Sequence, residues 1–394
     1  MTAFWLNLIA PFFWILIFLV FYVYFGYPLL LKTLVAFRFR KKITNYPQGS
    51  SGRPPRTTLI ISAFNEEGVI EDKIKNSLDL DYPKDMLEIM VVSDGSTDQT
   101  NQIVRKYENS SVRLIDHGER MGKTACLNHA VPLAVGDIIV FSDANSRYEA
   151  NALRLLVAHF LKNDIGFVTG WTKYSSGKND NNTTSIGLYS HLEAITKRLE
   201  SDSGCCVGAD GAIFAIRKHL YRQLDEADIN DLVIPFDIIK QGYRGILEPR
   251  AVCIEEAAED SSKEFSRQVR IMTRTIRAIG NNFELLNPFK YGFFSLQLFS
   301  HKCMKFFLPV ILILLFISSL SLVNQGGLYL ALFLSQVVFY GLSLLGYLWS
   351  KRGTPPKILS VPETFVLVNL ATLNGWKKIL KGDSYTVWTT VRCV

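Results

Sequence analysis

Two long stretches of the chain carry no charged side chain, residues 1–31 and residues 306–350. A helix needs about 20 apolar residues to cross the hydrocarbon core of a bilayer. The first stretch is long enough for one such helix, and the second, interrupted by polar and small residues at 324–327, is long enough for two. The pattern therefore predicts an integral membrane protein with about three transmembrane helices, over residues 4–31, 306–323 and 328–350.

A cleaved signal peptide is the alternative explanation for the N-terminal stretch. Such a peptide has a basic segment, a short apolar core and a small-residue cleavage site, and none of these is visible before Lys32. We therefore expect a retained anchor, with the lipid bilayer as its surroundings.

Basic residues gather at the edges of the predicted helices. Five lie within residues 32–42 with no acid among them, and residues 351–394 hold seven basic residues against two acids. Because Lys and Arg are enriched in cytoplasmic loops, we expect the N-terminus outside, the section after the first helix in the cytosol, and residues 351–394 as a basic cytosolic tail. The formal charge of +7 thus belongs to membrane edges and gives no reason to expect a nucleic-acid partner.

Between the membrane helices, short apolar runs rich in β-branched residues alternate with segments of helical spacing. After a basic juxtamembrane linker over residues 32–57, four such runs predict strands, at 58–64, 88–93, 112–117 and 137–142. The alternation indicates an α/β domain with a mostly parallel sheet, which we place over residues 58–287. Residues 288–305 are apolar with sparse cations and predict an amphipathic helix at the membrane interface, an ordinary domain helix being the alternative.

Polar side chains follow three of the predicted strands. Asn65 and Glu67 come after the first, Asp94 after the second, and Asp143 with Asn145 after the fourth. Turns and helix caps also favour these residue types. That explanation does not account for acids at successive strand ends that face one crevice, where open parallel sheets bind ligands. We therefore expect a ligand site at this edge.

The residue types at this edge point to a chemistry. The Asp94 carboxylate can accept hydrogen bonds from a nucleobase or a ribose, and the helix that follows it favours an anionic ligand. Asp143 and Asn145 can share a Mg²⁺ or Mn²⁺ ion with a diphosphate. In the acidic stretch 225–231, one carboxylate is a candidate general base, with a solvated loop as the alternative.

A run of arginines lies near the end of the predicted domain. Arg267, Arg270, Arg274 and Arg277 recur at helical spacing. Arginines three or four apart lie on one helix face and can clamp a diphosphate with forked donors. A basic helix that faces lipid headgroups is the alternative.

Together, these motifs resemble the membrane-bound glycosyltransferases of family 2, the group that includes cellulose, chitin and hyaluronan synthases. The resemblance covers nearly the whole chain and rests on ISAFNEE, VVSDGSTD, GKTACLNHA, FSDAN, VGADGAIFAIR, IND, RQVR and SHKCMKFFLP. It implies a Rossmann-like GT-A fold and an inverting, metal-dependent transfer from a nucleotide sugar, usually a UDP-sugar. It also implies a polysaccharide or oligosaccharide acceptor at the cytosolic face of a bacterial-type plasma membrane.

Carried over residue by residue, the resemblance gives each motif a role. Asp231 becomes the general base, Asp210 and Gly211 lie near the transferred sugar or the acceptor, and Asp143 with Asn145 holds the metal ion. The residues implied to bind the nucleotide sugar are Ala63, Asn65, Glu67, Asp94, Lys123, Asp143, Arg267 and Arg270.

Three departures from the family pattern leave alternatives open. Asn230 replaces an acid beside Asp231, Asn145 ends the metal motif, and Ile271 stands where processive enzymes carry an aromatic residue. Transfer of a single sugar to a lipid or lipid-linked acceptor, as in ceramide glucosyltransferase-like proteins, is the second hypothesis. A third, from another class, is a non-catalytic membrane scaffold or polymer-export component. A homo-oligomer or an export partner also stays open.

Overall fold

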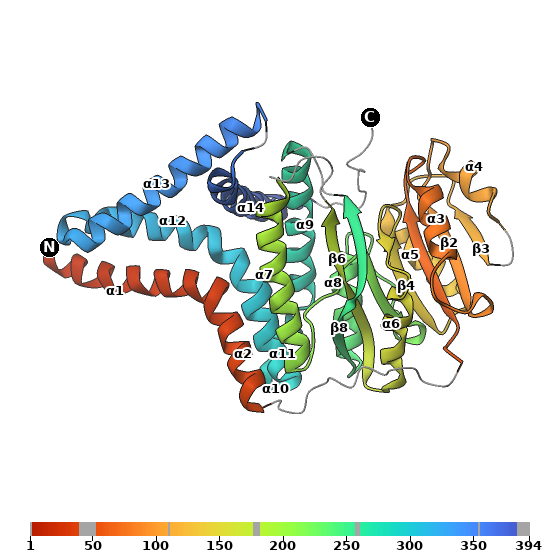
Figure 1. Ribbon diagram of the computed structural model, residues 1–394. Helices are drawn as coiled ribbons and strands as arrows, with labels where there is room; N and C mark the ends of the chain where they lie inside the picture. Colours follow the sequence, from red (N-terminus) through yellow and green to blue (C-terminus); the bar gives the residue numbers. More distant parts are fainter. Residues whose placement is uncertain are drawn as a thin grey trace.

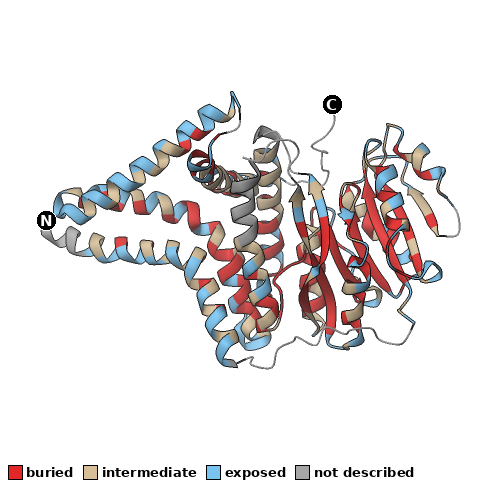
Figure 2. Ribbon diagram, in the orientation of Figure 1, coloured by how far each residue is buried: buried red, intermediate tan, exposed pale blue. Residues whose placement is uncertain are grey.

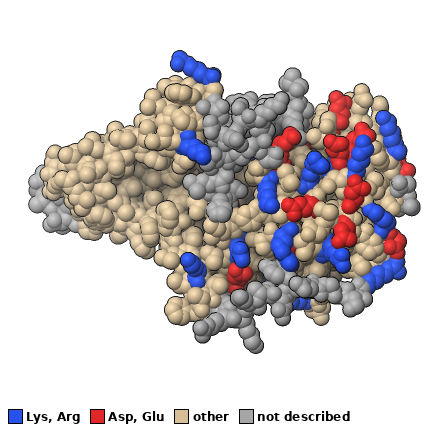
Figure 3. Space-filling model, in the orientation of Figure 1, with Lys and Arg blue, Asp and Glu red and all other residues tan. Residues whose placement is uncertain are grey.

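The protein separates into an α/β domain and a group of long apolar helices (Figure 1). The computed structural model describes residues 2–38, 53–108, 111–175, 182–256, 261–353 and 355–383. Most of the predicted linker and the last residues of the predicted tail lie outside these ranges. Figure 3 shows charged side chains gathered on the α/β domain and few on the long helices. The segments rich in charged residues and the long apolar segments therefore occupy separate parts of the molecule.

The α/β domain contains an eight-stranded sheet of order β3-β2-β1-β4-β7-β6-β8-β5. The pairs β1–β2, β2–β3, β1–β4 and β6–β8 are parallel, whereas β7 runs antiparallel to β4 and β6, and β5 antiparallel to β8. The strands are β1 (Thr57–Ala63), β2 (Leu87–Ser93), β3 (Val112–Asp116), β4 (Ile138–Asp143), β5 (Arg147–Tyr148), β6 (Ile165–Ser175), β7 (Ile213–Arg217) and β8 (Arg244–Glu256). The mostly parallel sheet expected from the sequence is confirmed.

The central strands are buried on both faces, which explains their unbroken apolar sequences. Ile60 belongs to one hydrophobic core, whereas its neighbours Leu59 and Ile61 belong to the other. Figure 2 shows the strands as the most buried part of the domain. Helices cover strands of this kind on both sides. They are α3 (Ile70–Leu78), α4 (Thr100–Arg105), α5 (Lys123–Leu133), α6 (Ala152–Ala158) and α8 (Asn230–Lys240), with short 3₁₀ turns η2 (Lys84–Met86), η3 (His159–Leu161), η4 (Lys218–Leu220) and η5 (Phe283–Leu286).

Two helices form the side of the domain that faces the long apolar helices (Figure 1). They are α7 (Asn182–Ser203) and α9 (Ser261–Asn281), and α9 carries the run of arginines. The helical spacing expected for these arginines is therefore present in the structure.

Within the described ranges, four helical segments are long and apolar enough to cross a membrane, at Leu8–Phe37, Phe293–Gln325, Gly327–Ser350 and Lys357–Leu380. They comprise α1 (Thr2–Phe21), the π-helical turn η1 (Tyr22–Gly26), α2 (Tyr27–Arg38), α12 (Met304–Leu322) with the turn η7 (Val323–Gln325), α13 (Gly327–Ser350) and α14 (Lys357–Leu380). Figure 1 shows α1, α12 and α13 extending away from the α/β domain, whereas α14 lies beside α9.

The fourth segment corrects the expectation of a basic tail over residues 351–394. Most of that section forms α14, which packs along α9 and α13 and buries Leu359 and Ala371. Its basic residues stand at its two ends, around Lys357 and Lys377, and leave an apolar middle. This helix was not predicted because the expectation rested on the net charge of residues 351–394 as a whole.

Residues 288–305 do not form the single helix that was expected. They form α10 (Pro288–Tyr291), α11 (Phe293–Leu298) and the π-helical segment η6 (Phe299–Cys303), which continues into α12. The break falls at Gly292, whose φ of 57° is a conformation that glycine adopts readily. Phe294 and Leu298 are buried in the α/β core, whereas Phe289 is fully exposed. The segment therefore packs on the domain and also presents apolar surface outward.

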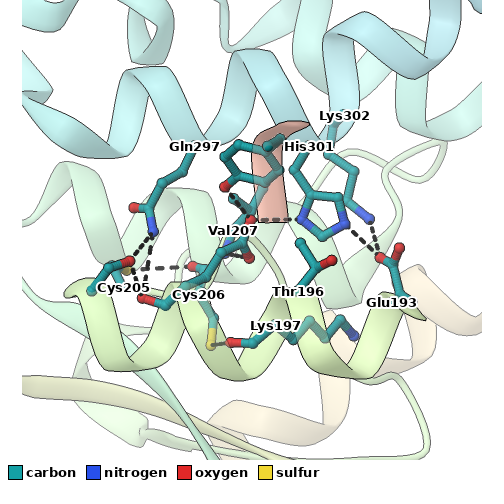
Figure 4. A network of polar contacts seen from close by, with 12 residues as sticks. Glu193, Thr196, Lys197, Cys205, Cys206, Val207, Gln297, His301 and Lys302 are labelled. Carbon is teal, nitrogen blue, oxygen red and sulfur yellow. Dashed lines mark hydrogen bonds and ion pairs between the residues drawn. The ribbon is translucent and has the colours of Figure 1, made fainter. Parts of the chain in front are cut away.

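A buried polar network joins the long helices to the α/β domain (Figure 4). Glu200 of α7 is fully buried, and its Oε1 accepts a hydrogen bond from the Tyr27 hydroxyl at 2.8 Å. The same oxygen lies 2.7 Å from Nδ1 of His301, whose Nε2 lies 2.7 Å from Glu193 Oε1. Lys302 donates to that Glu193 oxygen at 3.1 Å. Helices α2 and α7 and the segment η6 therefore meet at one cluster of paired charges.

Replacement Glu200→Leu should lower the unfolding temperature markedly. Removing one member of a buried ionic cluster typically costs about 3–5 kcal/mol, because the remaining groups lose their partner without regaining water. Thermal unfolding of the detergent-solubilised chain measures the effect. The matched control is Arg198→Leu, at an exposed position of the same helix, which should change the midpoint little. Equal midpoints for the two variants would contradict this role of Glu200.

Candidate active site

Asp94 organises the carboxyl end of β2. The side chain is fully buried, and its Oδ1 accepts hydrogen bonds from the backbone N–H of Met121 at 2.7 Å and of Gly122 at 2.8 Å. Among the described residues, its Oδ2 has no hydrogen-bond partner although it is buried. An unsatisfied buried carboxylate oxygen is costly, so a donor from a ligand would be well accommodated there.

Arg120, in the loop that Asp94 holds, was not foreseen from the sequence. Its guanidinium carbon lies 3.7 Å from the centroid of the Phe64 ring. Within the part of the chain that the structure describes, its Nε and Nη2 are buried without a hydrogen-bond partner. The loop packs so closely that a Cβ on Gly95, at φ +66°, would lie 2.5 Å from the Glu119 carbonyl carbon. The only signal in the sequence was the position of Arg120 just before the GK step.

The motif that follows β1 braces the neighbouring loop. Asn65, at φ 51°, accepts a hydrogen bond from the Thr97 N–H at 2.8 Å. Glu67 accepts a hydrogen bond from the Gln99 N–H at 2.9 Å. The Ala63 carbonyl accepts from the Asp94 N–H at 3.0 Å. The structure thus brings Ala63, Asn65 and Glu67 to the Asp94 edge. Their direct contact with a nucleotide stays a prediction.

Lys123 and Asp143 form an ion pair between the start of α5 and the end of β4. The Asp143 side chain is 36% exposed, and Asn145 is half-buried two residues further on. No group of three or more His, Cys, Asp and Glu in the described ranges is arranged to hold a metal ion. Mg²⁺ and Mn²⁺ often take one or two protein oxygens together with phosphate oxygens and water. Asp143 and Asn145 offer two such oxygen donors that solvent can reach, so the residues fit a cation that binds jointly with a diphosphate.

Glu255, at the end of β8, is a second residue that the sequence did not reveal. Its carboxylate accepts a hydrogen bond from the Ser146 hydroxyl, which draws it to the loop after β4. Burial, followed by the nearby charge of Asp143, raises the pKa of Glu255 to about 7. The acidic pair at 255–256 was visible in the sequence, but its strand was not among those predicted. Glu255 therefore adds a carboxylate beside the predicted metal residues.

Asp231 lies in the first turn of α8 and faces the Gly-rich turn before β7. A Cβ on Gly211 would lie 3.1 Å from Asp231 Oδ2. In the described part of the protein, Asp231 Oδ1 is buried and has no hydrogen-bond partner. Burial raises the pKa of Asp231 above its usual value; Lys123 and Lys197 oppose the rise, and Asp210 adds to it.

Asp210 is fixed beside this carboxylate. Its Oδ2 accepts a hydrogen bond from the Thr172 hydroxyl at 2.8 Å, and its N–H donates to the Thr169 hydroxyl at 2.8 Å. Both threonines belong to β6. The structure therefore brings Asp210, Gly211 and Asp231 together, as the sequence motifs implied.

Arg267 and Arg270 lie on α9. Arg267 pairs with Glu264 at 3.2 Å, and its charge also acts on Glu255. Arg270, one turn further along, is half-buried. The contact of both arginines with a donor phosphate stays a prediction.

Arg274 has a different function on the same helix. Its Nε donates to the Ala227 carbonyl at 3.1 Å, and its Nη2 donates to the Thr124 hydroxyl at 3.0 Å. A further bond reaches the Asp228 carbonyl. Arg274 thus ties the loop before Asp231 to the start of α5, which positions the candidate base relative to Lys123.

Comparison with known proteins agrees with this geometry. Residues 58–224 match the sequence model of the glycosyl transferase family 2. The "Probable glycosyltransferase YdaM" of Bacillus subtilis (strain 168) is 28% identical over 258 residues, which are 62% of this chain and 59% of that protein. The poly-beta-1,6-N-acetyl-D-glucosamine synthase of Staphylococcus aureus (strain MSSA476) is 27% identical over 203 residues, 50% of this chain and 48% of the relative. The chain thus spans about half the length of such relatives.

The fold is similar to that of mannosyltransferase PcManGT from Pyrobaculum calidifontis, whose structure was solved in complex with GDP-Man and Mn²⁺. The TM-score is 0.67 at 22% identity, and the match covers 93% of this chain and 98% of the other. Residues 58–224 are therefore similar to glycosyl transferase family 2 domains, and the fold is GT-A. The resemblance that the motifs suggested is confirmed.

Replacement Glu255→Gln should stabilise the protein more at alkaline than at acid pH. The folded-state pKa is raised from 4.5 to about 7, so ionisation of Glu255 opposes folding. The penalty is absent below the unfolded pKa and grows as pH rises through the folded pKa, reaching about 1–3 kcal/mol. Thermal unfolding with a chelator present, at about pH 5 and about pH 8, measures it. Glu256→Gln, at the exposed neighbour, is the control, and equal pH profiles for both variants would contradict the assignment.

Proposed function

We propose that this protein is an inverting glycosyltransferase that transfers a sugar from a nucleotide sugar to a hydroxyl acceptor at the membrane. The observation that carries the proposal is the arrangement at one edge of the sheet, where the ion pair of Lys123 and Asp143 shares the site with the buried Asp94 and with the half-buried Asp231, whose Oδ1 is enclosed. The polysaccharide synthase among the relatives and the GDP-Man complex of the similar structure support a nucleotide-sugar donor.

The nucleobase binds between Asp94 and Arg120 in this proposal. A uracil edge offers one N–H donor between two carbonyl oxygens, which complements one carboxylate oxygen and a guanidinium group. Arginine planes and aromatic rings also stack on bases, and Arg120 already lies over Phe64. These features favour a UDP-sugar as the donor.

The diphosphate lies where Lys123 now pairs with Asp143. Asp143 and Asn145 would hold a Mg²⁺ or Mn²⁺ ion there, which would supply charge neutralisation for the departing nucleoside diphosphate. Lys123, Arg267 and Arg270 then donate to phosphate oxygens, since charge-assisted hydrogen bonds to phosphate are the strong ones.

Asp231 removes the proton of the acceptor hydroxyl. A general base works best when its pKa lies near the ambient pH, and burial moves the pKa of Asp231 in that direction. Attack from the face opposite the departing diphosphate inverts the anomeric configuration. Asp210, beside the same Gly211, holds a hydroxyl of the sugar or the acceptor.

Two classes of acceptor are supported by different observations. The similarity to a polysaccharide synthase favours a glycan or oligosaccharide acceptor. A cavity between the long helices and α7 favours single transfer to a lipid or lipid-linked acceptor. The basic edges of the apolar segments support a cytosolic α/β domain and an external N-terminus in either case.

Replacement Asp231→Asn should abolish transfer while nucleotide binding persists. Loss of a general base lowers turnover by about 10²–10⁴-fold, and the amide keeps the shape of the side chain. Turnover is measured as nucleoside diphosphate release, and binding by calorimetry with UDP. Asp225→Asn, at an exposed acid of the loop that precedes α8, should retain activity. Unchanged turnover in Asp231→Asn would exclude this base.

Replacement Arg120→Gln should weaken UDP binding. A hydrogen bond to a charged group contributes about 1.5–3 kcal/mol, which corresponds to about 10-fold or more in affinity. Calorimetric titration with UDP measures the dissociation constant. The control is Arg105→Gln, at an exposed arginine that pairs with Asp116. If Arg120→Gln binds UDP as tightly as this control, the base contact is wrong.

A further inference from the structure

Lys197 is a charged residue beside the candidate base, and the proposed transfer gives it no role. It is half-buried on α7, four residues after Glu193 and three before the fully buried Glu200. Residues three or four apart share one face of a helix. Lys197 therefore belongs to the face of α7 whose two glutamates join the long helices to the α/β domain (Figure 4).

The Lys197 side chain reaches the Gly-rich turn on which the candidate base packs. Its ammonium donates to the Ala209 carbonyl at 3.4 Å, and the Ala209 N–H donates to the Asp231 carbonyl at 2.8 Å. The turn continues into Asp210 and Gly211, and a Cβ on Gly211 would lie 3.1 Å from Asp231 Oδ2. A single residue thus separates Lys197 from the backbone of the candidate base.

The two carboxylates at this turn hinder each other's ionisation. Burial raises the pKa of Asp231, and the charge of Asp210 adds to the rise. Two like charges close together disfavour the doubly ionised state, so one member of such a pair tends to keep its proton. A carboxyl group that keeps its proton cannot accept one from an acceptor hydroxyl. The pair therefore works as part of a base only with positive charge nearby.

Four cations from different elements interact with the charge of Asp231. They are Lys123 of α5, Lys197 of α7, Arg274 of α9 and Lys302 of η6. Three of them are held by other groups, namely Asp143, the carbonyls of the loop before α8, and Glu193. In the described ranges, Lys197 has only the Ala209 carbonyl as a hydrogen-bond partner. Its charge is therefore available to the two aspartates.

The environment of Lys197 keeps it protonated. Burial lowers the pKa of Lys197, but nearby negative charge outweighs burial, and the pKa is raised. The groups that raise it are Asp210, Glu193, Cys206 and Asp231. The same two aspartates that need a cation thus stabilise the ammonium form of Lys197.

We propose that Lys197 is a positioning residue for the general base: its ammonium holds the Gly-rich turn and keeps Asp210 and Asp231 together as ionised carboxylates. This inference rests on the proposed glycosyl transfer, in which Asp231 accepts the proton of the acceptor hydroxyl. Lys197 itself touches neither donor nor acceptor and acts through the two aspartates. Because it shares a helix face with Glu193, the contacts of Glu193 with η6 also fix where the ammonium stands.

The pH dependence of turnover tests the proposal, measured as UDP release by the full chain in nanodiscs. Loss of a cation beside a carboxylate raises the affinity of that carboxylate for a proton, by about 10-fold or more. In Lys197→Met, Asp231 should therefore stay protonated to higher pH. Turnover should fall about 10-fold more at the acid end of the profile than on its alkaline plateau, where the base is ionised in both proteins.

Three matched variants separate the charge of Lys197 from its packing. Lys197→Gln keeps a side-chain donor without the charge and should lose activity at acid pH as Lys197→Met does. Lys197→Arg keeps the charge and should restore the original profile. Arg198→Met, at the exposed neighbouring position of α7, should leave the profile unchanged. A loss that is equal at every pH, or equal profiles for Lys197→Met and Arg198→Met, overturns the proposal.

A double-mutant cycle in thermal unfolding distinguishes the failure of this proposal from the failure of the proposed function. The variants are Lys197→Met, Asp231→Asn and the two together. If the ammonium acts on Asp231, the midpoint change caused by Lys197→Met becomes smaller once Asp231 is replaced. Such coupling without sugar transfer from any donor would contradict glycosyl transfer and leave the interaction standing. Additive midpoint changes in a chain that transfers sugar would contradict the role of Lys197 alone.

Discussion

The buried carboxylate of Glu200 fixes the two parts of the molecule to each other. It accepts hydrogen bonds from Tyr27 in the first apolar segment and from the backbone of Val207, and it pairs with His301 of η6. A buried carboxyl group without water needs its hydrogen-bond partners, so the helices that provide them have one relative arrangement. Because α7 also carries Lys197, whose charge interacts with Asp231, this arrangement sets where the long apolar helices stand relative to the site.

The site itself has two sides with different supports. On the donor side, backbone hydrogen bonds to Asp94 shape the loop that carries Arg120, and the ion pair of Lys123 and Asp143 closes the end of β4. On the acceptor side, Asp231 belongs to α8 and is held in place by Arg274 through the preceding loop. In the proposed function the sheet edge binds the nucleotide, whereas Asp231 lies close enough to Lys302 of η6 for their charges to interact.

The gathering of Asp94 and Asp143 at one sheet edge could be predicted from the sequence because it follows from local patterns. Apolar runs followed by Asp94 and Asp143 indicate strand ends, and strand ends of a parallel sheet share one edge. Arg120 and Glu255 could not be found in this way. Arg120 is placed by its contact with the Phe64 ring and by the loop that Asp94 holds. Glu255 reaches Ser146 only because β8 pairs with β6, which is distant in sequence.

The long apolar helices could likewise be predicted only where a local sequence pattern specifies them. The three charge-free helices were visible because length and apolarity suffice to recognise them. Helix α14 was hidden by the basic residues at its ends, and the break at Gly292 depends on a backbone conformation that no local pattern specified. The cavity could not be predicted at all, because its walls come from segments far apart in the chain.

Nucleoside diphosphate release by the purified chain in lipid nanodiscs tests glycosyl transfer most directly. The protein is screened against uridine and guanosine diphosphate sugars with Mg²⁺ or Mn²⁺, and the products are weighed by mass spectrometry. We expect release of UDP from at least one UDP-sugar, dependent on the divalent cation, together with an acceptor that is heavier by one sugar. No release from any donor by folded protein would contradict glycosyl transfer and would favour a non-catalytic membrane scaffold.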